Sequence, residues 1–579
     1  MKRIVSSLSL LLVIAMLFSL MAGCGETAES TAEPVSAGAE SVEAVAEVPE
    51  PEPEPEMESA AEESIPAEPS IVEEPEPEPK ITINYPLEDD DLDLTYWMSF
   101  KSPHESIQSF GEFPVLATAE ELTGVKIEFT SENMMTASEK FNLMVASGDY
   151  CDLIGGTLGY YTGNFEEALA DGIAIDIADM IQENAPDYYT MLTEDENNYK
   201  ATVNDNGAMI AVYTIKDQYF PVMGGTVIRQ DWLDDLGYEA PASLSELDQF
   251  LRNCKAAYGA DYSIMLTYSN YLNLLSVSLG IGGGDATDGL YQVDGEVRFT
   301  YTQPEYKTYL EMAAAWYQDG IISTDFMNVG TTGLPMETYT YVYSGDTAVI
   351  AATASEIASM EAETGNGCKL VGYNLPAEDG SGVTHFTDMS MIKSSEHCTI
   401  TEQCENPEVA LKWINYWYTE YGAIVANYGT EGSSFEFDAE GNPQWTELIT
   451  ANEYDLPANR ASAIHTLYAH TTPIHTMETR LASTFSDAEN AVYDTWMTGI
   501  DGAYLLPAVS LTEEESETAR SPLADIQTYV EENVAKFING TRSVDEFDMF
   551  VADIEAMGIA DIIDVYQTAL ARYNSRSVA

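Results

Sequence analysis

Short apolar runs alternate with amphipathic runs from about residue 94 onward, and this alternation predicts α/β layers. Residues 94–100, 125–129 and 151–154 have the pattern of buried or alternating strands, and the last is closed by Gly155 and Gly156. Helices are predicted over 114–123 and 138–147, which end at Gly124 and Gly148. A βαβαβ opening of this kind brings the carboxyl ends of its strands to one edge of a sheet, where ligands bind in open α/β folds.

Later segments follow the same logic. Strands are predicted at 263–267 and 348–351, and Ser243 with Glu246 three residues later predicts a capped helix through residue 255. The aromatic run 413–418 fits a buried helix face. Trp232 fits the apolar side of a short helix that ends at Gly237, and residues 204–207 (NDNG) predict a hairpin turn.

The first residues form a secretory signal. Lys2 and Arg3 precede an apolar run over 4–20, and Ala22-Gly23 lead directly to Cys24. This resembles a bacterial lipoprotein signal, with Met21 where that pattern prefers Leu. It implies that residues 1–23 are removed and that Cys24 is lipidated, which would hold the protein at the extracellular face of the cell membrane. The alternatives are an ordinary signal peptide cut elsewhere, or an uncleaved helix.

Residues 24–79 predict a disordered tether behind that anchor. After Cys24 the segment contains 18 Glu and no Lys, Arg or Asp, with repeated Glu-Pro pairs. Like-charge repulsion and proline extend such a chain toward about 3.1 Å per residue, a reach of roughly 170 Å. The alternative is an acidic tail that binds a partner.

Charge excludes several partners for the remaining 500 residues. The chain has 98 acidic and 23 basic residues, and without the tether's 18 Glu and the signal's two bases, 80 and 21 remain. Nucleic acid and anionic membrane surfaces need clustered cations, so neither is an expected partner. Uronate polymers are disfavoured by long-range repulsion from the acidic chain, although a local basic pocket could override it.

Neither cysteine nor histidine spacing predicts a catalytic or metal centre. Five cysteines follow Cys24, an odd number with no zinc-ligand spacing, and only Cys398 and Cys404 are close enough in sequence for a local bridge. No nucleophile elbow, P-loop or His-Glu-x-x-His motif is present, so no enzyme activity and no cofactor are predicted. The metal content stays open, because residues 195–206 are acidic and amide-rich and could hold structural calcium, although they lack EF-hand spacing.

Eight short stretches together resemble the extracellular solute-binding proteins (family 1-like) of ABC importers, in the Gram-positive lipoprotein subgroup associated with carbohydrate uptake. One departure is Cys151, where Pro is commoner. The stretches occur in family order at 119–125 (AEELTGV), 139–154, 167–186, 228–237 (IRQDWLDDLG), 316–326 (WYQDGIISTDF), 406–432 and, within 511–573, the EEES of 513–516 and the remainder through TYVEENVAKFINGTRS to ALARY.

The resemblance implies a two-lobe, periplasmic-binding-protein-like fold of type II, with a mainly parallel sheet in each lobe and hinge strands between them. The expected lobes are 80–226 plus about 385–445, and about 227–384 plus 446–579. It also implies a monomer that closes on a solute and delivers it to permease subunits of an ABC transporter.

Aromatic residues, with 35 Tyr, 18 Phe and 7 Trp, suit a sugar ligand, because sugar rings have apolar faces and a hydroxyl rim. Trp97 is the strongest candidate. Alternation along its strand places Trp97 on one face and its sequence neighbours on the other, and one of these two faces is expected to look into the cleft. The alternative is that Trp97 is buried beneath the helix 114–123. The candidate ligand-binding residues follow predicted strand ends or crossings, with Thr353 and Glu356 taken loosely from the related maltose-binding protein: Trp97, Phe100, Tyr160, Tyr161, Arg229, Tyr268, Asn270, Tyr271, Thr353, Glu356, Glu431 and Trp445. The predicted ligand is a neutral oligosaccharide. The alternatives are a peptide and, with least support, a substrate of a secreted glycan-active enzyme.

Overall fold

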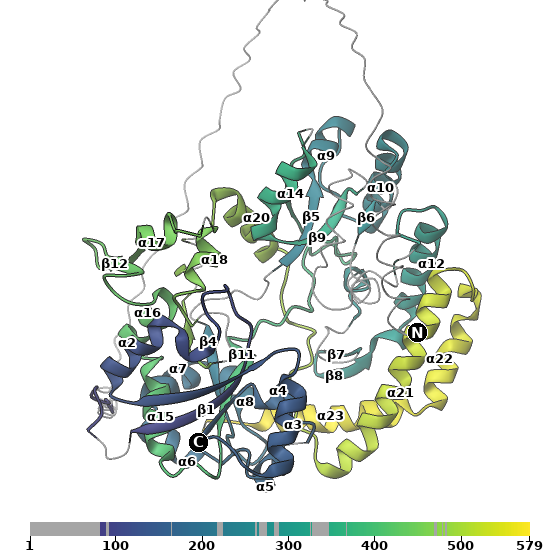
Figure 1. Cartoon of the computed structure of the whole chain (residues 1–579). Helices are drawn as coiled ribbons and strands as arrows, with labels where there is room; N and C mark the ends of the chain where they lie inside the picture. Colours follow the sequence, from purple (N-terminus) through teal and green to yellow (C-terminus); the bar gives the residue numbers. More distant parts are fainter. Residues whose placement is uncertain are drawn as a thin grey trace, which may run out of the picture. The chain divides into compact units, whose positions relative to one another are not determined.

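The computed structural model describes most of the compact unit Glu78–Ala579 (Figure 1). The described residues are 81–88, 92–163, 165–216, 224–260, 263–265, 275–282, 289–324, 326, 347–365, 367–454, 456–467, 472–477, 479–480, 483 and 485–578. Within these ranges, no helix has both the length and the apolar character needed to cross a membrane.

The first sheet is mainly parallel, as predicted. Its strand order is β14-β4-β11-β3-β1-β2, and β1 pairs in parallel with both β2 and β3, while β11 runs antiparallel between β3 and β4. The strands are β1 (Asp93–Phe100), β2 (Lys126–Asn133), β3 (Leu153–Gly155), β4 (Val212–Lys216), β11 (Ile392–Ile400) and β14 (His475–Thr476).

Local sequence signals explain the first helices. α2 (Pro114–Thr123) begins with proline, and Gly124 ends it with a φ of 75°. α3 (Ala137–Ser147) ends at Gly148 in the same way, so both predicted helices are confirmed. Phe141 and Met144 are buried on α3. The strands β1, β2 and β3 lie within a few residues of their predicted positions.

The hairpin predicted at 204–207 is wrong. The turn exists, since Gly207 N–H donates to Asn204 O at 3.0 Å, but it follows α8 (Glu196–Thr202) instead of a strand. α8 begins at Asp195, whose side chain accepts from the Asn197 N–H. An Asn-Asp-Asn-Gly sequence favours a tight turn both between two strands and after a helix. The N-cap Asp195 favours a helix before this turn, so α8 precedes it instead of a strand.

The second sheet has the order β10-β5-β9-β6 and is mostly antiparallel. Only β6 and β9 pair in parallel, so the expectation of a mainly parallel sheet holds for the first lobe alone. The reason is connectivity, because β5 is placed between β9 and β10 and runs opposite to both. The strands are β5 (Gly224–Arg229), β6 (Ile264–Met265), β9 (Val349–Thr353) and β10 (Leu370–Tyr373).

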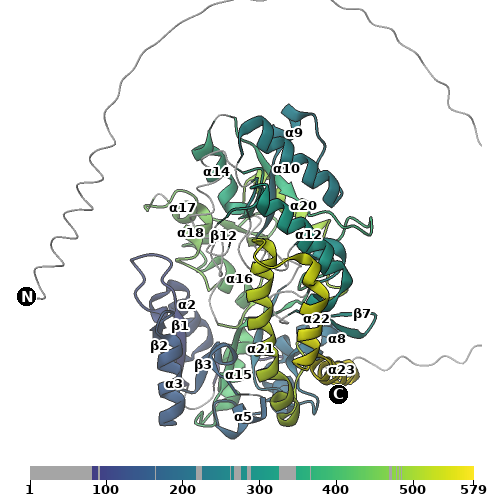
Figure 2. The same cartoon turned by 90° about the vertical axis from the view of Figure 1, so that its right-hand side faces the viewer.

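Helices from distant parts of the sequence complete the second lobe (Figure 2). Ser243 caps α10 by accepting from the Glu246 N–H, as predicted, and Trp232 is buried in α9. One apolar core joins side chains of these helices to those of the last three, α21, α22 and α23. The helices are α9 (Gln230–Leu236), α10 (Leu244–Tyr258), α12 (Pro304–Gln318), α20 (Asp487–Met497), α21 (Glu513–Ile538), α22 (Phe547–Ala556) and α23 (Ile559–Ser575).

The chain passes between the sheets more than once. β4 and β5 belong to different sheets, and so do β10 and β11, so the chain crosses after residue 216 and again between residues 373 and 392. The boundary expected at 445 lies too early for the first sheet. β14 pairs with β4 through His475 and Thr476, and α15 (Pro407–Tyr416) and α16 (Glu420–Tyr428) precede it.

Candidate functional site

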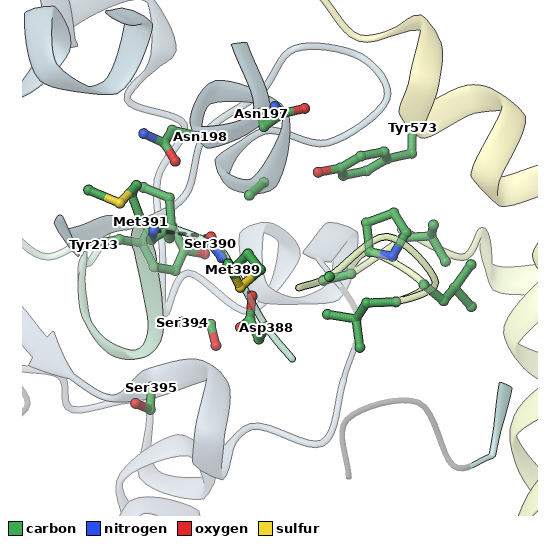
Figure 3. A pocket seen from close by; sticks show the side chains of 18 of the residues that line it. Asn197, Asn198, Tyr213, Asp388, Met389, Ser390, Met391, Ser394, Ser395 and Tyr573 are labelled. Carbon is green, nitrogen blue, oxygen red and sulfur yellow. Dashed lines mark hydrogen bonds between the residues drawn. The ribbon is translucent and has the colours of Figure 1, made fainter. Parts of the chain in front are cut away.

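A cavity of about 1620 Å³, here called the interlobe pocket, lies at the carboxyl edge of the first sheet. Its first-lobe wall contains Gly156 and Tyr160 just after β3, Tyr213 of β4, and residues of α8 and β11. Its second-lobe wall contains Gln292 of β7 (Leu290–Val293), the segment 505–509 and the end of α23. Figure 3 shows the pocket, with Asn197, Asn198 and Tyr213 of the first lobe and Tyr573 of α23 among the side chains drawn around it.

The segment after β3 is shaped by a glycine. Gly156 has a φ of 71°, which a residue with a side chain rarely adopts, and it begins the short helix α4 (Thr157–Tyr160). The Thr157 hydroxyl lies 2.7 Å from that of Thr399 and also donates to Ile154 O at 3.0 Å. These bonds hold α4 against β11, so Tyr160 has a fixed position at the pocket wall.

His397 also anchors α4. Its Nε2 accepts from the Leu158 N–H at 2.9 Å, and its Nδ1 lies 2.8 Å from Ser394 O. Because Leu158 N–H is a donor and Ser394 O is an acceptor, the hydrogen is assigned to Nδ1. Burial lowers the pKa of His397 to about 4, so the ring is neutral at physiological pH.

Amide and phenol groups face each other from the two walls. Asn197 and Asn198 come from the beginning of α8, and Tyr566, Tyr573 and Asn574 come from α23. Figure 3 shows Tyr573 projecting from its helix into the pocket. Such groups form hydrogen bonds with hydroxyls and pack against apolar ring faces.

No lysine or arginine is among the described residues that line the pocket. Asp195 and Asp388 are the acidic ones, and His397, the histidine there, is neutral. An anionic ligand would therefore enter a site without a compensating cation, which carries a desolvation cost. The lining suits a polar, uncharged ligand.

Of the predicted ligand-binding residues, the structure places Tyr160 in the lining of this pocket. Trp97 is only 4% exposed and packs with Phe141 of α3 and edge-on against Tyr160. Phe100 is also buried, against Phe110 and Phe113. Both are core residues, because helices and loops cover the end of β1; for Trp97 the covering helix is α3, whereas the sequence suggested 114–123.

Arg229 forms an ion pair with Asp231 and lies 4.3 Å from the centre of the Trp232 ring. It is buried beside α9 and does not line the pocket. Thr353 and Glu356 form a capping box at the end of β9, a local structural role that explains this pair of residues.

The other predicted residues lie elsewhere. Tyr161 donates to Asp171 Oδ2 at 2.7 Å. Glu431 accepts from the Tyr421 hydroxyl, and the Trp445 indole donates to the Ser483 hydroxyl at 2.9 Å. These three are not in the pocket lining. Tyr268, Asn270 and Tyr271 lie outside the described residues.

Sequence reasoning missed most of the lining. Tyr213 and His397 lie on strands whose neighbours are far away in the sequence, and Tyr573 and Asn574 are near the end of the chain. The one available signal was the amide-rich stretch 195–206, which we interpreted only as a metal candidate. Asn197 and Asn198 belong to it.

The sequence also left a metal site and a local disulfide open. Across the described part of the chain, no cluster of three or more His, Cys, Asp or Glu residues could hold a metal ion. Cys398 and Cys404 are free thiols in the structure, and burial raises the pKa of Cys398 to about 12.

The sequence and the fold both match known proteins. A family described as bacterial extracellular solute-binding protein matches residues 104–424. The chain is 24% identical over 419 residues to Lipoprotein LipO of Bacillus subtilis, covering 66% of this chain and 78% of LipO. It is 23% identical over 517 residues to the fructooligosaccharide ABC transporter substrate-binding protein FusA of Streptococcus pneumoniae, covering 83% of this chain and 89% of FusA.

Solved structures show the same two-lobe fold. An HMO binding, ABC-transporter-associated solute-binding protein from Bifidobacterium longum infantis superimposes with a TM-score of 0.68 at 18% identity. That match covers 84% of this chain and 100% of the other.

Proposed function

Because the chain belongs to the bacterial extracellular solute-binding protein family, we propose that it captures a neutral oligosaccharide and delivers it to an ABC transporter permease. It acts from the extracellular face of the membrane, held by lipid on Cys24 and kept at a distance by the acidic tether. The ligand occupies the interlobe pocket, and the protein turns nothing over.

The residues that line the interlobe pocket support a neutral sugar as the ligand. Tyr160, Tyr213 and Tyr573 offer aromatic faces and hydroxyls, and Asn197 and Asn198 offer amides. A neutral sugar can use all of these groups. A uronate would leave its carboxylates without a cation among the described lining residues, near Asp195 and Asp388.

The relatives support this choice. FusA is named for fructooligosaccharide transport, and the Bifidobacterium protein is named for HMO binding. LipO is named as a lipoprotein, which is consistent with an anchor at Cys24.

A thermal-shift screen tests the ligand class. A ligand that binds only the folded protein stabilises it by RT ln(1 + [L]/Kd), about 2.7 kcal/mol at one hundred times Kd. Neutral oligosaccharides should raise the melting temperature, and uronate oligomers of equal length should not. A rise with uronates or peptides alone would overturn the proposal, and turnover of a sugar by stoichiometric protein would indicate an enzyme.

Anchoring and closure need separate measurements. Cys24→Ser should release the protein from cells into the medium, whereas retention would contradict lipidation. If the lobes close, the radius of gyration in solution scattering should fall with saturating ligand, because a ligand favours the state in which it has more contacts.

A further inference from the structure

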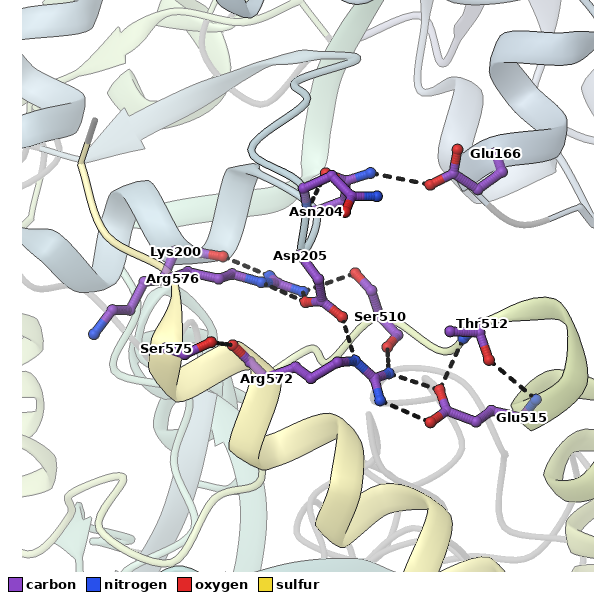
Figure 4. A network of polar contacts seen from close by, with 11 residues as sticks. Glu166, Lys200, Asn204, Asp205, Ser510, Thr512, Glu515, Arg572, Ser575 and Arg576 are labelled. Carbon is purple, nitrogen blue, oxygen red and sulfur yellow. Dashed lines mark hydrogen bonds and ion pairs between the residues drawn. The ribbon is translucent and has the colours of Figure 1, made fainter.

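Two arginines near the end of α23 reach across to the first lobe and meet at one carboxylate. Arg572 Nε donates to Asp205 Oδ2 at 2.7 Å, and Arg576 donates to Asp205 Oδ1 from Nε at 2.9 Å and from Nη2 at 2.6 Å. Figure 4 shows the two guanidinium groups on either side of Asp205. We call Asp205, Arg572 and Arg576 the interlobe clamp.

The two sides of the clamp belong to different lobes. Asp205 is in the turn between α8 and β4, and β4 is part of the first sheet. α23 packs through Ile559, Ile562 and Leu570 into the apolar core of the second lobe.

Each side of the clamp is braced by its own lobe. Arg572 also donates to both carboxylate oxygens of Glu515, at 2.7 and 2.6 Å, and Glu515 is at the start of α21. On the first-lobe side, Asn204 Oδ1 accepts from the N–H groups of Asn206 and Ala208 and holds the turn. One more bond crosses between the lobes: Arg576 Nη1 donates to Lys200 O at 2.7 Å, at the last turn of α8.

Burial makes these contacts stronger than ordinary surface ion pairs. The side chain of Arg576 is 3% exposed, and that of Asp205 is 20% exposed. Bidentate, charge-assisted hydrogen bonds fix both distance and orientation, and low exposure limits screening by salt.

The clamp joins the two walls of the interlobe pocket. Asn197, Asn198 and Ala201 of α8 line one side, and Tyr573 and Asn574, next to Arg572, line the other. We infer that Asp205, Arg572 and Arg576 are positioning residues that hold α23 on the first lobe and thereby set the spacing of the ligand-binding walls. This role rests on the proposed function, since it assumes that the pocket binds the ligand.

Asp205→Asn is the direct test, because it removes the shared charge while the Arg572–Glu515 pair inside the second lobe stays. Glu196→Gln is the matched control: Glu196 is on the same α8 and pairs with Lys200 at 3.0 Å, within one lobe. Hydrogen exchange of the ligand-free, full-length protein should speed up at least threefold in both 196–208 and 566–578 in D205N, and stay unchanged in E196Q.

Unchanged exchange in 566–578 of D205N would overturn the clamp. If D205N does not fold, Arg576→Gln allows the same comparison, because it leaves Asp205 paired with Arg572.

The effect on the pocket is measured with kestose, a neutral trisaccharide. Its affinity should fall about tenfold in D205N, mainly through faster dissociation, and stay within twofold of the wild type in E196Q. Equal kestose affinity in D205N and wild type would overturn the positioning role. If the wild type does not bind kestose, that result counts against the proposed ligand, while the exchange measurement still decides whether the clamp joins the lobes.

Discussion

The carboxyl ends of β1 and β3 lie at the same edge of the same sheet, and the two strands are direct neighbours. β1 ends in Trp97 and Phe100, two large aromatics, and both are buried. β3 ends in Gly155 and Gly156, and the segment that follows lines the interlobe pocket.

The difference lies in what covers each strand end. After β1 the chain returns over the sheet with Phe110 and Phe113, which pack against Phe100. After β3 the turn at Gly156 leads directly into α4, and Tyr160 lines the pocket while its ring makes a T-shaped contact with the Trp97 ring. In this sheet a strand's carboxyl end borders the pocket only where the next segment leaves it open, and the small residue marks that place while the aromatic residues mark the core.

The largest expected effect is that of Trp97→Ala, which tests whether the end of β1 is core. Removing a buried Trp from beneath α3 should cost about 3–5 kcal/mol of unfolding free energy, measured by chemical denaturation. The folded variant should bind ligand with wild-type affinity. Trp445→Ala is the matched control, because Trp445 is half-buried on a small hairpin and its loss should cost less. Wild-type stability together with weakened binding would show that Trp97 contacts the ligand and is not a core residue.

His397, which anchors α4 at the end of β3 by accepting from Leu158 N–H, should make the free energy of unfolding depend on pH. The pKa of His397 is about 4 in the folded protein, against 6.5 for the unperturbed group, because burial disfavours the imidazolium. The unfolded chain takes up this proton as pH falls from 6.5 to 4 and the folded protein does not. The contribution of neutral, buried His397 to the free energy of unfolding is therefore fully present above pH 6.5, and about 3 kcal/mol of it is lost as the pH falls to 4.

Many carboxylates titrate over part of the same pH range, so His397→Gln supplies the comparison. The glutamine can still accept from Leu158 N–H but does not titrate. As the pH falls from 6.5 to 4, the wild type should lose more unfolding free energy than H397Q does. A difference that stays constant with pH would show that His397 is not responsible.

Tyr160→Ala tests whether the end of β3 contacts the ligand. Loss of an aromatic pocket wall should weaken binding by about 1–3 kcal/mol, or roughly 5-fold to 150-fold in Kd by calorimetry. Tyr161→Ala is a close control, since Tyr161 is next in sequence but bonds to Asp171 outside the pocket. Equal losses in both variants would contradict the assignment.

The smallest effect extends the comparison to the end of β9 in the second lobe. Thr353→Ala removes one half of the capping box and should cost about 1 kcal/mol of stability. Thr353→Ser should retain most of it, and ligand affinity should not change in either. A loss of affinity in T353A at wild-type stability would indicate that this strand end also contacts the ligand.

Local signals in the sequence determined the elements and much of the fold class. Periodicity predicted β1, β2 and β3; glycine stops predicted the ends of α2 and α3; and Ser243 with Glu246 predicted the cap of α10. These signals succeed because a cap or a periodic pattern acts within a few residues of itself. The short motifs in family order predicted the solute-binding family for the same reason, since turns and caps are local.

Tertiary structure alone decided which side chains meet. Asp205 and Arg572 are 367 residues apart in sequence, and no local pattern relates them. The face of Trp97 was undecided because alternation places it on one side of β1 but does not say which helix covers that side. The packing of α3 on β1 makes Trp97 a core residue, and the approach of α23 to α8 forms the pocket. Neither can be predicted locally, since burial depends on neighbours that come from elsewhere in the chain.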